Sequence, residues 1–194
     1  MSKGKPSPAK GKKVGPKGKT AAQTKAMRSR SVARLSVVQA LYQMEIAETD
    51  LNEVAAEFAA GSMNQFIKDA EGVDLAEPDA KFFRDLIFGV VRNQKDIDPA
   101  INTALAKSWA LDRIDATLRA ILRAGAYELR YRPDVPMKAI ITEYLEVARA
   151  FFDGPEAKVV NGVLDALARQ WRETAGEGCE GREVRAGDKT PPPT

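Results

Sequence analysis

The spacing of the apolar residues is what most constrains how this chain can fold. From about residue 31 to residue 171, large apolar side chains recur every three or four positions, which is the period of one face of an α-helix. The widest of these faces is formed by Phe82, Phe83, Leu86, Ile87, Val90 and Val91. No segment combines β-branched residues with the period of two that a strand requires. We therefore predict an all-α protein.

The expected helix boundaries follow from capping residues, glycines and prolines. Asp50 with Glu53 is typical of a helix start, and Gly61 is typical of a helix end. Pro99 is expected to interrupt a helix, and residues 62–75 give no clear pattern. The predicted helices cover about residues 31–47, 50–61, 79–94, 100–106, 115–131, 136–152 and 156–171. Short connections between them predict a compact bundle of about seven helices.

Charge is distributed unevenly along the chain and indicates three parts. Residues 1–34 contain eleven Lys or Arg residues and no acidic residue, whereas the remaining 160 residues carry 19 basic and 27 acidic side chains. We expect residues 1–27, rich in Lys, Gly and Pro, to form a disordered basic arm. One helical domain should follow over residues 28–173, and a disordered tail over residues 174–194. With neither a secretory signal nor a membrane-spanning stretch in the sequence, we expect a cytoplasmic protein.

The residue types that most enzymes use are missing or isolated. The chain has no histidine, and its one cysteine, Cys179, lies in the tail, so neither a zinc cluster nor a disulfide is expected. Residues 18–20 read Gly-Lys-Thr, but a nucleotide-binding loop would need glycine where this chain has Lys13. Acidic pairs such as Glu143 with Glu146 fit a solvated helix face better than a catalytic acid and base. We predict no enzymatic activity, no metal and no cofactor.

Arginines at the start of the first predicted helix indicate a polyanionic partner. Arg28, Arg30 and Arg34 lie at the helix end whose dipole disfavours cations, a cost that a bound phosphate backbone would reverse. Arg30 and Arg34 are four residues apart and therefore share a helix face. Gln39 and Tyr42 lie further along, and guanidinium, amide and phenol groups suit the bases of single-stranded RNA. Tyr42 fits the core equally well, because it belongs to the apolar stripe of this helix.

Four stretches of the sequence resemble the NusB family of bacterial transcription antitermination factors. They are ARLSVVQALYQ, FFRDLIFGVVRN, LRAILRAGAYELRYRPDVPMKAIITEYLEVARAF and VVNGVLDALA, and the resemblance extends over about residues 30–172. It implies an all-α fold of two small helical subdomains. It also implies binding of the boxA element in ribosomal RNA leader transcripts, together with ribosomal protein S10. That pair would join other Nus factors on RNA polymerase, so that ribosomal RNA operons are read past terminators.

The resemblance also implies two patches that face RNA. The first follows the start of the first helix and falls on Arg30, Arg34, Gln39 and Tyr42. The second surrounds the loop before the last helix, AFFDGPEAKVVNG, and places Phe151 and Lys158 as candidate RNA contacts. Residues 154–157 depart from the family, because many members carry an acidic and serine-containing stretch there. For Asn161-Gly162 we expect a role in helix packing.

Two other functions fit the same sequence. A NusB-like domain also occurs as the N-terminal regulatory module of rRNA cytosine methyltransferases, although such an enzyme would need a cofactor-binding α/β domain as well. Alternatively, the chain is a helical protein-interaction module whose basic arm serves only solubility. Capture of partners before and after RNase treatment would separate this last alternative from an RNA-binding adaptor.

Overall fold

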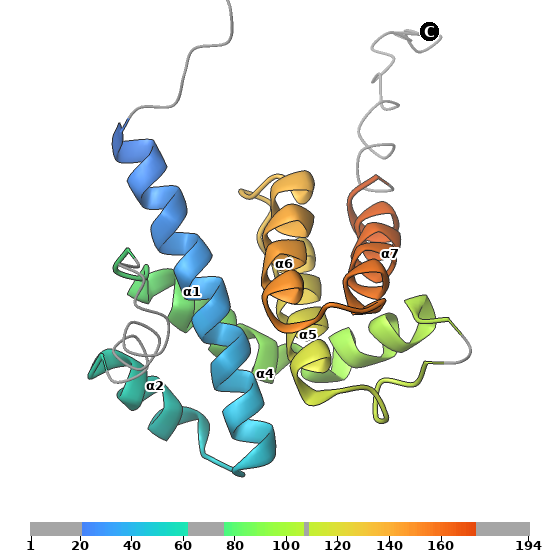
Figure 1. The fold of residues 1–194 in the computed structure, drawn as a ribbon, viewed down its shortest axis with the longest axis horizontal. Coiled ribbons are helices and arrows are strands. Elements are labelled where there is room, and N and C mark those ends of the chain that lie inside the picture. Colours follow the sequence, from blue (N-terminus) through green and yellow to red (C-terminus); the bar gives the residue numbers. More distant parts are fainter. Residues whose placement is uncertain (1–20, 62–75, 107–108, 174–194) are drawn as a thin grey trace, which may run out of the picture.

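A computed structural model describes residues 21–61, 76–106 and 109–173, and the elements within these ranges are all helical (Figure 1). They are α1 (Ala21–Ile46), α2 (Leu51–Ala59), α4 (Ala80–Ala104), α5 (Ala116–Tyr131), α6 (Met137–Phe151) and α7 (Glu156–Ala168), followed by a π-helical turn at Arg169–Glu173. The all-α prediction is confirmed, with six α-helices in the described ranges where about seven were predicted along the whole chain. The ambiguous residues 62–75, the predicted tail and residues 1–20 of the predicted arm lie outside the described residues.

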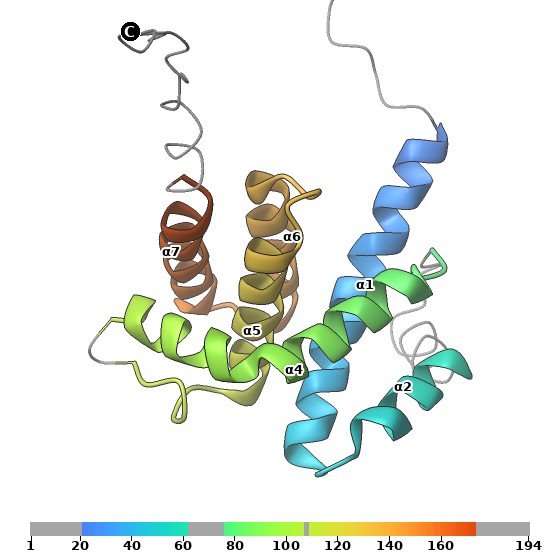
Figure 2. The same ribbon diagram turned by 180° about the vertical axis from the view of Figure 1, so that it is seen from behind.

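The helices pack around one apolar core. α1 and α4 both contact α5, α2 is held against α1 and α4, and α5, α6 and α7 pack side by side (Figures 1 and 2). Phe58 of α2 stacks on Phe83 of α4, with ring centroids 3.6 Å apart. Burial of each large apolar side chain contributes about 1.5–3 kcal/mol to folding. Fully buried side chains from four of the helices include Leu86, Ile101, Leu122, Tyr144 and Leu164.

Three aspartates begin helices: Asp50, a helix start predicted from the sequence, and Asp79 and Asp115, which begin the predicted ranges 79–94 and 115–131. The carboxylate of Asp50 accepts a hydrogen bond from the backbone N–H of Asn52 at the start of α2. Asp79 caps α4 in the same way, and Asp115 caps α5. Each such cap stabilises its helix by about 1 kcal/mol, because it satisfies an N–H group that has no partner within the helix. Gly61 follows α2 with φ of 77°, the left-handed conformation that glycine adopts most easily.

Two predicted helix boundaries are wrong. α1 begins at Ala21 rather than at about residue 31, so residues 21–27 of the predicted arm belong to this helix. Residues 21–30 contain neither proline nor glycine, and the helical period therefore extends without an interruption. α4 continues through Pro99 to Ala104. Pro99 is exposed, while Ile97 and Ile101 on either side of it are fully buried, so packing holds the helix together where the proline removes one hydrogen bond.

Glycines in the helices have contrasting surroundings. A Cβ atom added to Gly89 in α4 would lie 2.0 Å from the ring of Tyr127 in α5, so only glycine allows these helices to approach this closely. A Cβ atom added to Gly125 in α5 would lie 2.9 Å from Leu164 in α7. Gly162 is different, because it is exposed and has no atom within 4 Å of such a Cβ. The prediction that Gly162 serves close helix packing is therefore wrong.

The last described turn closes the end of α5. The guanidinium of Arg172 donates hydrogen bonds to the backbone carbonyls of Glu128, Leu129, Arg132 and Val135, at 2.6–3.2 Å. Carbonyl groups at a helix C-terminus have no partner within the helix, and a cation suits the negative end of the helix dipole. One side chain from the end of the bundle therefore fixes the turn between α5 and α6.

Candidate nucleic-acid interface

The first turns of α1 that carry described side chains present two arginines to the surface. Arg28 is exposed, and the side chain of Arg30 is 41% exposed. The guanidinium of Arg30 lies 5.0 Å from the centre of the Phe82 ring, and its Nε atom is 3.7 Å from a carboxylate oxygen of Asp79. Stacking on the ring holds Arg30 in place, while the long and partly exposed ion pair is weak. Both cations are therefore available to a phosphate group.

Arg34, the third predicted cation, is turned into the protein. It is 4% exposed, and its Nε atom donates to Oε2 of the fully buried Glu128 at 2.9 Å. A second carboxylate, that of Glu143, lies 3.3 Å from the same guanidinium, and the Tyr144 hydroxyl donates to Glu128 at 3.1 Å. Burial lowers the pKa of Arg34, but the hydrogen bond and charge of Glu128 outweigh this effect and raise it. Arg34 is therefore a core residue in this structure. Its side chain is not exposed for the predicted contact with RNA.

Gln39 and Tyr42 lie on different sides of α1 from Arg30. A helix has 3.6 residues per turn, so Gln39 is about half a turn around the helix from Arg30, and Tyr42 about a third. Gln39 is half-buried, and its carbonyl oxygen has no hydrogen-bond partner among the described residues. Tyr42 is 42% exposed, which favours the surface position over the core position that the sequence left open. Its ring is accessible for stacking.

The second predicted patch is at the turn between α6 and α7. Phe151 is the last residue of α6 and is 43% exposed, and Lys158 is exposed in the first turn of α7. Gly154 and Pro155, also exposed, lie in the short connection between the two helices. Figure 1 shows this connection at one end of the paired helices, apart from the first turns of α1. The predicted residues that are exposed therefore lie at separate places: Arg28 and Arg30 in the first part of α1, Tyr42 further along it on another side, and Phe151 and Lys158 at the α6–α7 turn.

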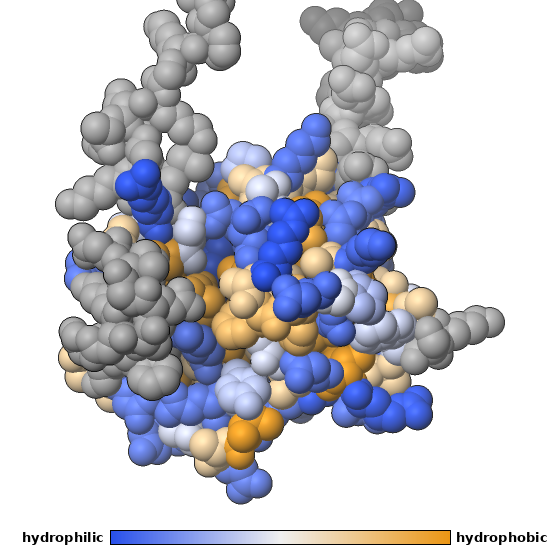
Figure 3. Space-filling model, in the orientation of Figure 1, coloured by the Kyte–Doolittle hydropathy of each residue, from blue (hydrophilic) through white to orange (hydrophobic). Residues whose placement is uncertain are grey.

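Apolar side chains of large size are seldom exposed in the described part of the chain. Tyr42, Ile46 and Phe151 are the three that are exposed there, and two of the three are aromatic residues predicted to contact RNA. Figure 3 shows one face of the molecule, on which hydrophilic side chains predominate around smaller apolar areas. Exposed aromatic rings are surfaces on which the bases of single-stranded nucleic acids stack.

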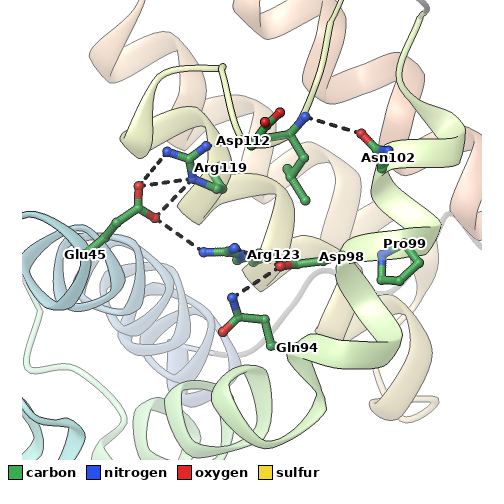
Figure 4. A pocket seen from close by; sticks show the side chains of 9 residues that line it. Glu45, Gln94, Asp98, Pro99, Asn102, Asp112, Arg119 and Arg123 are labelled. Atoms are coloured by element: carbon green, nitrogen blue, oxygen red, sulfur yellow. Dashed lines mark hydrogen bonds and ion pairs between the residues drawn. The ribbon is translucent and has the colours of Figure 1, made fainter.

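A hollow of about 820 Å³ lies between the end of α1, the second half of α4 and the start of α5 (Figure 4). Its two arginines already have carboxylate partners. Arg119 donates to Glu45 at 3.1 Å, and Arg123 donates to Asp98 at 2.8 and 2.9 Å. The hydrogen bond to Glu45 raises the pKa of Arg119 despite the opposing effect of burial. These ion pairs join α1, α4 and α5, and they leave neither guanidinium free for a phosphate.

Within the described ranges, no group of three or more Cys, Asp or Glu side chains is arranged to hold a metal ion. None of the described helices is long and apolar enough to cross a membrane.

Comparison with known proteins settles the family. The sequence model of the NusB family matches residues 31–169. The chain belongs to the NusB family. The match includes Arg34, Gln39, Tyr42, Phe151 and Lys158, whereas Arg28 and Arg30 lie just before it.

Two NusB proteins are similar to the chain over nearly their whole length. It is 53% identical over 144 residues to the transcription antitermination protein NusB of Caulobacter vibrioides, covering 74% of this chain and 95% of the relative. The NusB of a Rhizobium etli strain is 49% identical over 157 residues, which cover 81% of this chain and 96% of the relative. These relatives are named as antitermination factors.

Solved NusB structures share the fold. The chain superimposes on NusB of T. maritima with a TM-score of 0.60 at 28% identity, covering 76% of this chain and 96% of that one. The solution structure of NusB from Aquifex aeolicus gives a TM-score of 0.58 at 24% identity, covering 82% and 99%. A crystal structure of the antitermination factors NusB and NusE in complex with double-stranded RNA gives 0.57 at 21% identity, covering 75% and 99%. The helical arrangement described above is therefore that of NusB.

Proposed function

We propose that this protein is a transcription antitermination factor that binds boxA RNA of ribosomal RNA leader transcripts together with ribosomal protein S10. In this role it is an adaptor and catalyses no reaction. Family membership and the names of relatives about 50% identical support the proposal. It acts in the cytoplasm, where it joins other Nus factors and RNA polymerase in the antitermination complex and promotes read-through of ribosomal RNA operons.

The observation that carries the proposal is the exposure of two aromatic rings, whereas most large apolar side chains in the described part of the chain are buried or partly buried. Tyr42 and Phe151 are 42% and 43% exposed. Stacking of an unpaired base on such a ring contributes about 1–3 kcal/mol to binding. Arg28, Arg30 and Lys158 supply positive charge for the phosphate groups, and that attraction is independent of sequence. We assign these five residues to the RNA-binding surface.

The partner protein is supported by a comparison structure. In that structure the antitermination factors NusB and NusE are in complex with double-stranded RNA, and NusE corresponds to the S10 partner proposed here. The body of the present chain after residue 34 has a net charge of −8, and a basic ribosomal protein complements an acidic surface. In the sequence, the Lys-rich residues 1–20 add positive charge before Arg28 and Arg30.

A titration of labelled boxA RNA, with and without S10, tests the proposal. Tyr42→Ala and Phe151→Ala should each weaken binding of boxA RNA about 5- to 150-fold, which corresponds to the loss of one stacked base. Ile46→Ala is the matched control, because Ile46 is also exposed on α1 but has no aromatic ring. The wild-type protein should prefer boxA over a scrambled RNA of the same length, and S10 should increase the preference. Equal affinity for both RNAs, with and without S10, would contradict the proposal.

A further inference from the structure

A small hollow between α6 and α7 collects positive charge from two helices. Its volume is about 250 Å³, and Arg149 of α6 lies on one side of it. Lys158 and Asn161 of α7 lie on the other side. The remaining lining is apolar and comes from Leu145 and Ala157. Two cations and an amide from separate segments of the chain therefore border one space.

The absence of carboxylates from the lining distinguishes this hollow from two others in the described residues. Carboxylates line the 820 Å³ hollow, where they pair with its arginines. A third hollow, of about 420 Å³, is lined by Asp115 and Glu156 as well as Arg113. An anion entering either of those would meet negative charge. An anion entering between α6 and α7 would meet Arg149, Lys158 and the amide of Asn161, with no carboxylate in the lining.

Neither cation is held by a buried carboxylate among the described residues. Arg149 donates to Glu146 at 2.8 Å, one helical turn earlier, but the two side chains are 62% and 66% exposed. Such surface pairs contribute about 0–1 kcal/mol, so a phosphate can replace Glu146 at little cost. Lys158 forms no ion pair with any carboxylate of the described residues. Arg149 presents a planar fork of donors and Lys158 a point charge, a combination that suits the oxygens of one phosphate group.

We infer that this hollow, bordered by Arg149, Lys158 and Asn161, is a subsite for one phosphate group of the RNA backbone. The inference rests on the proposed function and adds Arg149 and Asn161 to the RNA-binding surface. RNA is favoured over an acidic protein because Phe151 is exposed at the end of the same helix as Arg149. Phe151 follows Arg149 by two residues and begins the short connection that leads to Lys158, so one single strand passing this turn can place a base on the ring and a phosphate in the hollow.

Arg149→Ala and Lys158→Ala, alone and combined, test this subsite. The measurement is the affinity for boxA RNA and for scrambled RNA at several salt concentrations. One phosphate contact in single-stranded RNA contributes about 0.7 to the slope of log affinity against log salt concentration. Because both residues hold the same phosphate, the double variant should lose about 0.7 and not twice that amount. Both RNAs should be weakened by the same factor, since a phosphate contact carries no sequence information.

Arg169→Ala is the matched control. Arg169 is 65% exposed and pairs with Asp165 one turn earlier on the same helix, as Arg149 pairs with Glu146, but it does not border the hollow. This control should keep the wild-type salt slope, and Arg149→Lys should keep most of it. All variants should retain the helical circular dichroism of the wild type, because both cations are on the surface.

The outcomes separate this inference from the proposed function. If the wild type shows no preference for boxA, both fail. If the wild type binds boxA specifically but Arg149→Ala and Lys158→Ala keep its salt slope, only the subsite is overturned. The subsite is also overturned if these variants lose S10 binding while their RNA slope is unchanged, because the hollow would then contact protein.

Discussion

The guanidinium of Arg34 on α1 forms two hydrogen bonds with the carboxylate of Glu128 on α5, and both groups are buried. Tyr144 on α6 donates to the same carboxylate, so one buried acid joins three helices. Burial and the charge of Glu128 raise the pKa of Tyr144, which keeps its hydroxyl protonated as a donor. The helix that carries Arg28, Arg30 and Tyr42 is therefore fixed to α5 and α6 by charge as well as by apolar packing.

Arg34→Ala should destabilise the protein strongly. Removal of one partner of a buried ion pair leaves the other charge unpaired and costs about 3–5 kcal/mol. Urea unfolding followed by circular dichroism measures this loss. Arg28→Ala, a change of an exposed arginine on the same helix, should alter the free energy of unfolding by less than about 0.5 kcal/mol. Similar values for the two variants would mean that Arg34 is not buried against Glu128.

Gly89→Ala should also destabilise the protein, by about 1–3 kcal/mol, because the new methyl group would overlap the ring of Tyr127. Gly162→Ala should have the opposite effect. Gly162 lies in α7 with open space around it, and alanine has a higher helix propensity by about 1 kcal/mol. Thermal unfolding of the two variants should therefore shift the midpoint in opposite directions. Stabilisation by Gly89→Ala would contradict the close approach of α4 and α5, and destabilisation by Gly162→Ala would contradict the open space around Gly162.

Arg172→Ala should lower the free energy of unfolding by about 1.5–3 kcal/mol, because four backbone carbonyls lose a charged donor. Arg172→Lys should restore less than half of this loss, since an ammonium group cannot span the four carbonyls. Chemical unfolding of these variants beside Arg169→Ala provides the comparison. If Arg172→Ala and Arg169→Ala are equally stable, the closure of α5 by Arg172 is not significant.

Sequence reasoning predicted the helices well where local signals determine them. Asp50, Gly61, Asp79 and Asp115 define helix ends through their own backbone and side-chain chemistry, and the structure has these ends. It was wrong at Pro99, because the burial of neighbouring side chains overrides a local signal that is normally disruptive. Tertiary packing is not visible in the spacing of residues along one helix.

For the candidate site, too, local spacing could be predicted from the sequence, whereas contacts between helices could not. Spacing places Arg30 and Arg34 on one face of α1, but it does not reveal that α5 brings a carboxylate to only one of them. The signal for this was the position of Glu128 among apolar residues in AGAYELRY, which is typical of a buried acid that needs a cationic partner. Arg149 was missed because its proximity to Lys158 depends on the packing of α6 against α7.

Low pH should weaken the ion pair between Arg132 and Asp134 at the surface. Hydrogen bonds from Arg132 lower the pKa of Asp134, so its carboxylate stabilises the folded state above the usual Asp pKa of about 4. This stabilisation is lost as pH falls through the lower pKa of the folded state. Asp134→Asn should therefore reduce the free energy of unfolding near neutral pH and have less effect in acid. Because the Asp134 side chain is 52% exposed, we expect at most about 1 kcal/mol.

Urea unfolding of Asp134→Asn at about pH 6 and about pH 3 checks this dependence, since the stabilisation is complete well above the usual Asp pKa and is partly or wholly lost below it. Asp153→Asn serves as the control, because Asp153 is exposed and forms no ion pair within the described residues. A difference from wild type that is the same at both pH values would contradict the role of the Asp134 charge.

Photo-crosslinking tests the central claim most directly. BoxA RNA with a photoreactive uridine at each uridine position in turn would be irradiated with the protein and S10, and the linked residues identified by mass spectrometry. We predict crosslinks to Tyr42 and Phe151, with far fewer from a scrambled RNA. Crosslinks confined to α2 or to the hollow of Arg119 and Arg123, or equal yields from both RNAs, would contradict the assigned RNA-binding surface.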